Sequence, residues 1–211
     1  MRVRASLVSA KIATRGWRQL VLLIAVAVLA ALNPAPSRAQ NFTYSEFKFG
    51  VWDHDVHFLG GKEHGADINA EYIFSSPVTE DMIAGLPSWL HFALQPRPTA
   101  GIAINTAGDT DQFYLGGTWS WFLARQLVLP QDGIVFSFFF GPGFNDGKRG
   151  PAPDDRKALG FPLLFREAAE LGYQINETWE VSTYLDHISN GGLAKYNQSV
   201  NDVGLRLGYR F

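Results

Sequence analysis

The chain closes on the stretch Val203-Gly204-Leu205-Arg206-Leu207-Gly208-Tyr209-Arg210-Phe211, and this stretch decides the fold class. Large apolar side chains occupy every second position, and glycine or arginine occupies the positions between them. Successive side chains of a β-strand point to opposite faces, so this spacing separates an apolar face from a face that carries Arg206 and Arg210. The stretch therefore predicts an amphipathic β-strand.

Four other segments repeat this alternation. Their apolar faces comprise Ala66, Ile68, Ala70, Tyr72 and Phe74; Phe113, Leu115, Trp119 and Trp121; Ala169, Leu171, Tyr173 and Ile175; and Trp179, Val181, Thr183 and Leu185. Three less regular segments lie near 42–52, near 89–104 and at 134–140, and two prolines in the second of them, Pro96 and Pro98, predict a bulge or a local break there. Together the segments predict an all-β fold, an eight-stranded antiparallel β-barrel.

The two faces of such strands can point in either direction. A soluble sandwich or lipocalin buries the apolar face, whereas a membrane barrel turns it toward lipid and lines its lumen with the polar face. Two features favour the membrane: Trp and Tyr lie near the strand ends, where aromatic girdles belong, and the closing Tyr209-Arg210-Phe211 is similar to the C-terminal signature of outer-membrane barrels. We therefore expect a transmembrane barrel in the outer membrane of a Gram-negative bacterium. Inside it, Arg206 and Arg210 should pair with lumen acids, among them Glu71, Glu170, Glu180 or Asp186.

Residues 1–39 have the pattern of a targeting segment. Five basic residues open it, 20–32 is continuously apolar, and Ser37 and Ala39 supply small residues before a cleavage site. The pattern predicts a secretory signal peptide over 1–39 and a mature barrel over 40–211, with an uncleaved membrane anchor as the alternative.

The charge and the cysteine content of the mature chain exclude several classes of function. Removal of six of the 18 basic residues leaves 12 against 20 acidic residues, a net charge of −8. Such a charge disfavours a nucleic-acid partner. The chain contains no cysteine, so it forms neither a disulfide framework nor a thiolate metal site.

An eight-stranded barrel fixes the direction of each strand. Both termini should be periplasmic, with inner turns at 75–87 and 176–178 and outer loops at 53–64 and 143–160. The interior of so narrow a barrel is filled by side chains, so a general pore is excluded. Function is therefore expected on the outer wall or in the outer loops.

The outer end of the predicted strand at 179–189 carries the chemistry. His187 and Ser189 share the outward face of this strand, and Asn201 shares the outward face of the next. A nucleophilic Ser, a basic His and an orienting third residue form the acyl-transfer arrangement, and backbone N–H groups of Asn190-Gly191-Gly192 could stabilise an oxyanion. Residues at the wet edge of a loop are the alternative interpretation.

The motif His187-Ile188-Ser189-Asn190-Gly191-Gly192, followed by Asn197 and the amphipathic final strand, resembles the lipid A 3-O-deacylase (PagL) family, often labelled acyloxyacyl hydrolase. The resemblance implies an eight-stranded outer-membrane barrel that hydrolyses a fatty acyl ester of lipid A at the outer leaflet. It implies Ser189 as nucleophile, His187 as general base, and Asn190, Gly192 and Asn197 as oxyanion or orienting residues. It implies no cofactor; lipid A or lipopolysaccharide is the expected partner, and a homodimer is considered.

The sequence departs from the family pattern at one position of the triad. Where the family has Glu, this chain has Asn201, which can orient an imidazole but cannot offset its charge. If Ile175 pairs with Trp179 across the turn, the register sets Glu167 beside His187, so Glu167 is the second candidate for this role.

Two other interpretations stay open. A catalytically silent structural or adhesive barrel would use its outer loops for contacts, and Asn201 favours this alternative. The alternating Asp53, His54, Asp55 and His57 suggest a metal site, but we expect a solvated loop there and predict no metal.

Overall fold

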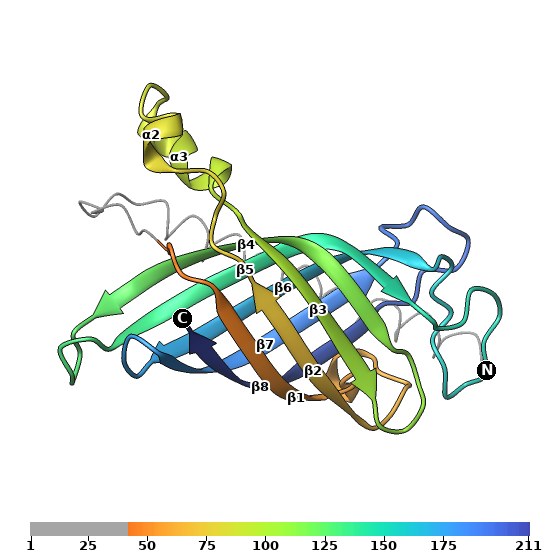
Figure 1. Cartoon of the computed structure of the whole chain (residues 1–211). Coiled ribbons are helices and arrows are strands. Elements are labelled where there is room, and N and C mark those ends of the chain that lie inside the picture. Colours follow the sequence, from red (N-terminus) through yellow and green to blue (C-terminus); the bar gives the residue numbers. More distant parts are fainter. Residues whose placement is uncertain (1–41) are drawn as a thin grey trace.

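The computed structural model describes residues 42–211, which form one closed barrel of antiparallel strands in sequence order (Figure 1). The strands are β1 (Glu46–Asp53), β2 (Ala66–Ile73), β3 (Arg97–Asn105), β4 (Gln112–Arg125), β5 (Gly133–Asn145), β6 (Leu163–Gln174), β7 (Trp179–Ser189) and β8 (Val200–Arg210). β1 pairs with β8 and closes the cylinder. The predicted fold class is confirmed, whereas the predicted signal peptide lies outside the described residues.

The faces of the strands point as the alternation predicts. In β8, Leu205 is 68% exposed and the adjacent Arg206 only 3% exposed, and the same contrast runs through β2, β6 and β7. Because the buried set is polar and the exposed set is apolar, the barrel is built for contact with lipid. The soluble alternative, with its apolar face inside, does not fit this arrangement.

Both arginines of β8 point into the lumen, where carboxylates meet them. Arg206 pairs with Glu71 and lies 3.7 Å from Glu170. Arg210 pairs with Glu180. The expected pairing is therefore confirmed for three of the four acids.

The fourth acid, Asp186, has a different partner. Its carboxylate accepts a hydrogen bond of 3.1 Å from Arg166 Nε. Lower in the lumen, Lys48 Nζ lies 2.9 Å from both Glu170 and Glu180. These ion pairs fill the interior and satisfy charges that would be costly to bury alone.

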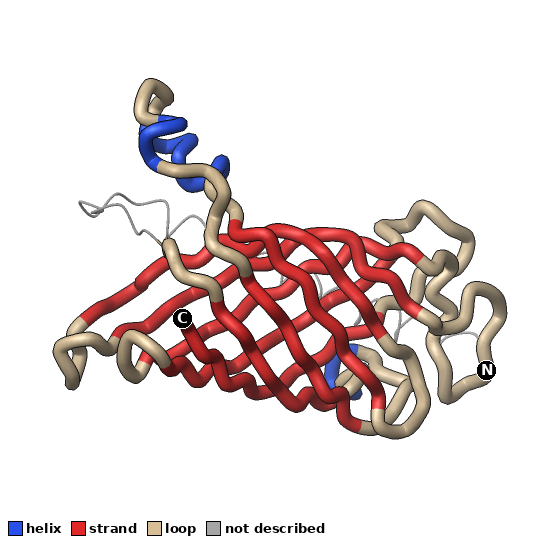
Figure 2. The backbone as a smooth tube through the Cα atoms, in the orientation of Figure 1, coloured by secondary structure: helices blue, strands red, loops and turns tan. Residues whose placement is uncertain are grey.

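The connection between β2 and β3 differs from the prediction. It contains two short helices, α2 (Glu80–Ile83) and α3 (Ser88–Leu94), which project from the barrel wall (Figure 2). The predicted strand near 89–104 therefore begins only at Arg97. Pro87 precedes α3, and a helix start tolerates a residue without an N–H. Pro96 follows α3, where a proline cannot continue the helix. No helix among residues 42–211 is long and apolar enough to cross a membrane.

Pro98 stands inside β3, near its start. Its carbonyl accepts a hydrogen bond from the Phe74 N–H, and it lies opposite Gly117 of β4. A proline so close to a strand end removes little of the ladder, so the strand needs no break here.

Outward-facing aromatic residues surround the end of the barrel that carries the C-terminus. The rings of Trp179 and Tyr209 lie 5.0 Å apart, and those of Tyr72 and Phe211 lie 5.9 Å apart. Such rings mark the membrane–water interface, and short turns and termini belong to the periplasmic side. The opposite end, with the loops after β1, β5 and β7, is extracellular.

Candidate active site

The outer end of β7 brings the predicted site residues together. His187 lies opposite Asn201 of β8 on one side and opposite Glu167 of β6 on the other. Ser189, two residues further along β7, lies opposite Phe165. The predicted register is therefore present on both sides of the strand.

Asn201 holds the imidazole of His187. The Nδ1 atom of His187 lies 2.7 Å from Asn201 Oδ1, and because a carbonyl oxygen can only accept, Nδ1–H is the donor. Nε2 is then the basic nitrogen of the neutral ring. His187 is buried although it is on the outward face. The strand pair thus presents an oriented base beside Ser189.

Glu167 keeps its register position, which is opposite His187 on the side away from Asn201. The hydrogen bond to Asn201 orients the ring in this structure, and a role for Glu167 stays a prediction.

Asn190 orders the loop that follows β7. Its Nδ2 donates to the carbonyls of Leu159 at 2.8 Å and Tyr196 at 2.6 Å, and its Oδ1 accepts from Gly192 N–H at 3.0 Å. The Asn190 backbone N–H donates to Asn197 Oδ1 at 2.9 Å. The N–H groups of Asn190 and Gly192 are thus engaged within the loop, which favours the orienting role for both.

Two hydrogen-bond donors of this loop, on Asn197 and Gly191, are not used by the loop itself. Asn197 uses Oδ1 within the loop, which leaves its Nδ2 hydrogens for a ligand. Gly191 has a φ of +64°, a left-handed conformation that favours glycine. Within the described part of the chain, its N–H has no hydrogen-bond partner. The loop therefore offers two N–H donors near Ser189.

An apolar groove of about 480 Å³ lies beside the residues that flank Ser189. It follows the outward face of β5 and β6 and is lined by Phe140, Gly141, Pro142, Phe161, Pro162, Leu163, Leu164, Phe165, Asn190 and Leu193. Because Phe165 lies opposite Ser189 and Asn190 follows Ser189 in the chain, part of the groove wall is adjacent to Ser189. Sequence reasoning missed this groove; the apolar run at 161–165 was the available signal.

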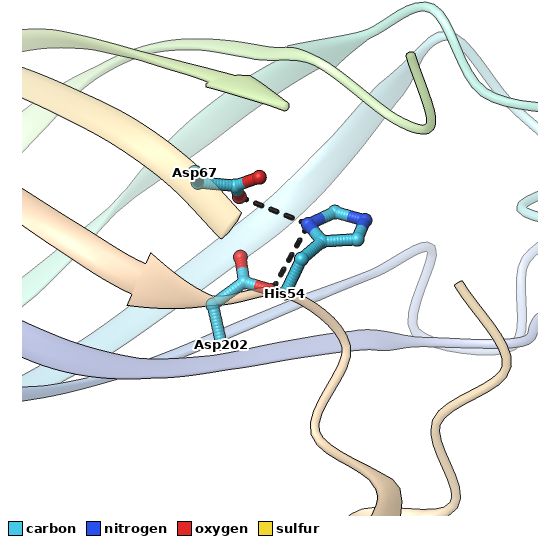
Figure 3. A group of neighbouring side chains, drawn as sticks. All are labelled: His54, Asp67 and Asp202. Carbon is cyan, nitrogen blue, oxygen red and sulfur yellow. Dashed lines mark hydrogen bonds and ion pairs between the residues drawn. The ribbon is translucent and has the colours of Figure 1, made fainter. Parts of the chain in front are cut away.

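The loop after β1 is buried where we expected a solvated segment. His54 and Asp55 are 1% and 0% exposed. His54 Nδ1 lies 2.9 Å from Asp67 and 3.4 Å from Asp202 (Figure 3). On the other side of the ring, Nε2 lies 3.1 Å from Glu63. The expectation of a solvated loop is therefore wrong for His54 and Asp55: carboxylates surround the His54 ring, and Lys157 and two backbone N–H groups of the loop bind the Asp55 carboxylate.

A positive charge on His54 explains why three carboxylates gather around its ring. Burial alone would lower the pKa of the imidazole, but the hydrogen bonds to Asp67 and Glu63 raise that pKa to about 11. His54, Asp67 and Asp202 present ligand atoms within 4.8 Å of one another, a spacing that suits a cation. Both ring nitrogens face carboxylates, so the imidazolium is itself that cation.

Comparison with known proteins gives a family. The sequence model of the family described as Lipid A 3-O-deacylase (PagL) matches residues 103–210, just over half of the chain and the part that contains His187 and Ser189. None of the curated proteins matches significantly.

Among solved structures, "Crystal structure of the outer membrane enzyme PagL" is 15% identical with a TM-score of 0.54, covering 77% of this chain and 97% of that one. The N-terminal β-barrel domain of Pseudomonas aeruginosa OprF is 9% identical with a TM-score of 0.45, covering 80% and 98%. At 15% identity the first likeness shows a shared barrel fold. With the family match, it follows that the chain is an outer-membrane barrel and belongs to the lipid A 3-O-deacylase (PagL) family.

Proposed function

We propose that this barrel hydrolyses a fatty acyl ester of lipid A at the outer leaflet, with Ser189 as nucleophile and His187 as general base. The observation that carries the proposal is the 2.7 Å hydrogen bond from His187 to Asn201, on the outward face and two residues from Ser189. A base oriented toward lipid serves no purpose in the packing of a polar lumen.

The reaction follows from these roles. Ser189 Oγ attacks the ester carbonyl while His187 Nε2 takes its proton. The tetrahedral intermediate collapses, and the imidazolium returns the proton to the departing sugar oxygen. Water then attacks the acyl-serine with the same base, which releases the fatty acid and restores Ser189. No cofactor takes part in any of these steps.

The loop after β7 supplies the oxyanion donors. Asn197 Nδ2 and the Gly191 N–H are two donors of this loop that make no hydrogen bond within the described residues. Donors fixed in advance stabilise developing negative charge without reorganisation. Asn190 and Gly192 hold this loop in shape.

The groove along β5 and β6 receives the acyl chain. Its lining is almost entirely apolar, and it includes Phe165 and Asn190, which are neighbours of Ser189. An acyl chain in this groove stays in contact with apolar side chains while its carbonyl reaches the nucleophile. The partner is thus lipid A in its own leaflet; a homodimer stays a prediction, which sedimentation in detergent would test.

A catalytically silent barrel is the second candidate. The presence of Asn201 where the family has Glu favours it, since an amide cannot offset the imidazolium charge. The outer loops after β1 and β5 would then be contact surfaces.

Mass spectrometry of lipid A separates the two candidates. The refolded barrel is incubated with lipid A in mixed micelles, and we expect a product that lacks one fatty acyl chain. Ser189→Ala should give no product while it still shifts on unheated gels as a folded barrel. Turnover that survives in folded Ser189→Ala, or no turnover by the wild type, would contradict the proposal.

A further inference from the structure

We infer that His54 is a positioning residue for the ester-hydrolysing site: from the lumen side of the wall it fixes β8 through Asp202, and thereby fixes Asn201 against His187. The inference rests on the proposed function. His54 touches neither substrate nor His187, so its effect must pass through β8.

Asn201 and Asp202 are neighbours on β8 with opposite directions. Asn201 points outward to His187 Nδ1, and Asp202 points inward to His54 Nδ1 at 3.4 Å. Because the two side chains share one stretch of backbone, a shift of Asp202 also moves the Asn201 amide.

The loop that carries His54 makes two further hydrogen bonds to Asn201 and Asp202. The Asp55 N–H donates to Asp202 Oδ1 at 2.9 Å, and the Val56 N–H donates to the Asn201 carbonyl at 2.8 Å. These bonds extend β8 beyond its pairing with β1, which ends at Asp53 opposite Val203. The backbone of Asn201 is therefore held by the loop after β1 as well as by β7.

The loop itself is tightly determined. Asp55 has a φ of +46°, and its Oδ2 accepts the N–H groups of Lys62 at 2.6 Å and Glu63 at 3.1 Å. A Cβ atom on Gly61 would stand 1.6 Å from the Asp55 carbonyl oxygen, so only glycine fits there. Because the loop is rigid, a displacement of the loop also displaces the part of β8 to which it is bonded.

Asn201 needs this support more than a carboxylate would. A Glu at this position would be attracted to the imidazolium as it forms, and the attraction would correct small errors in position. An amide orients the ring only by one hydrogen bond, which weakens steeply when its geometry changes. The site therefore depends on the precision with which β8 is held.

The test is a double-mutant cycle in kcat. We expect His54→Gln to lower kcat about tenfold to a hundredfold, as small misplacements do, with little change in KM. In an Asn201→Ala background the same change should have no further effect. Arg97→Gln is the matched control: it breaks a buried lumen ion pair with Glu46 at the periplasmic end, and kcat should hold.

Equal losses of kcat in Arg97→Gln and His54→Gln, or additive losses with Asn201→Ala, would overturn the inference. Asp202→Asn replaces His54→Gln if the latter fails to fold. A readout free of turnover is the ¹⁵N NMR signal of His187 in Ser189→Ala. The Nδ1–H tautomer should lose dominance when His54→Gln is added; an unchanged signal also overturns the inference. A wild type without ester hydrolysis but with this NMR change would reject the proposed function alone.

Discussion

The rate of the proposed reaction depends most on Asn201, the residue that orients His187. It gives His187 a fixed tautomer, but its amide carries no charge to stabilise the imidazolium of the transition state. This barrel should therefore be a slow enzyme with room for improvement at a single position.

We predict that Asn201→Glu raises kcat by at least about tenfold, since a carboxylate would face the protonated ring. Glu167→Gln should be nearly silent, because the hydrogen bond to Asn201 already orients the His187 ring. Release of fatty acid from lipid A measures both. If Glu167→Gln lowers kcat far more than Asn201→Ala does, Glu167 is the acid of the triad.

Asn197 permits a test of the oxyanion donors without loss of the loop. Asn197→Asp keeps the oxygen that accepts the Asn190 N–H and removes the Nδ2 hydrogens. We expect kcat to fall about a hundredfold or more, in line with the loss of one oxyanion donor, while unfolding in urea is unchanged. Full activity in Asn197→Asp would assign the oxyanion to other donors.

The loop after β1 should give the barrel a pH-dependent stability. His54, with its pKa raised from 6.5 to about 11, contributes fully below pH 6.5 and loses this contribution as pH rises through about 11. Burial alone would raise the pKa of Glu63, but hydrogen bonds from His54 and the Lys157 N–H hold it at about 2 rather than 4.5, so its contribution fades as pH falls from 4.5 toward 2.

The measurement is the temperature at which the folded gel band disappears. The difference between the wild type and His54→Gln should be largest below pH 6.5 and should shrink steadily toward pH 11. A difference that stays constant over that range would mean that His54 is not charged in the folded barrel.

The helices α2 and α3 stand at the periplasmic end, away from Ser189. The Phe92 ring packs 4.3 Å from the ring of Trp121 on the outward face of β4, but no strand pairing depends on either helix. We predict that a short Gly-Ser turn in place of residues 76–95 leaves folding and lipid A hydrolysis intact. A matching replacement of the loop at 190–199 should abolish hydrolysis and leave the barrel folded.

Each part of the molecule was predictable to the extent that its signal is local. Alternation at period two is a property of a single strand, so it located β8 and its faces, and the tight turn before Trp179 carried the register as far as His187. The segment at 88–94 is apolar without that period; we expected it to be part of a strand, and it forms a helix instead. The burial of His54 and the groove at Phe165 arise from contacts between distant segments, which no local pattern records.

The lumen of the whole barrel is held by charges that depend on one another. Lys48 lies between Glu170 and Glu180, each at 2.9 Å, and also 3.7 Å from Glu46. Removal of one partner leaves carboxylates buried without compensation. The interior of the barrel is thus held together by a network of ion pairs and not by an apolar core.

We predict that Lys48→Met destabilises the barrel by about 3–5 kcal/mol, the usual effect of breaking a buried ion pair. Urea unfolding in lipid vesicles measures this change. Lys195→Met, on an exposed loop position, should shift unfolding by less than about 0.5 kcal/mol. Equal effects of the two substitutions would show that the lumen charges are well solvated.

The strand β7 joins the aromatic girdle to Ser189, so its length fixes the depth of the proposed nucleophile in the membrane. It runs for 11 residues from Trp179 to Ser189. With a rise of about 3.4 Å per residue and a tilt of about 40°, Ser189 stands roughly 25 Å from the plane of the girdle, which is the height of the apolar band of such barrels. If Ser189 is the nucleophile that we propose, the barrel selects its ester by depth: only a bond at the outer boundary of the hydrocarbon layer meets Ser189. A thicker bilayer would lift that bond out of reach, so membrane thickness becomes a control on its rate.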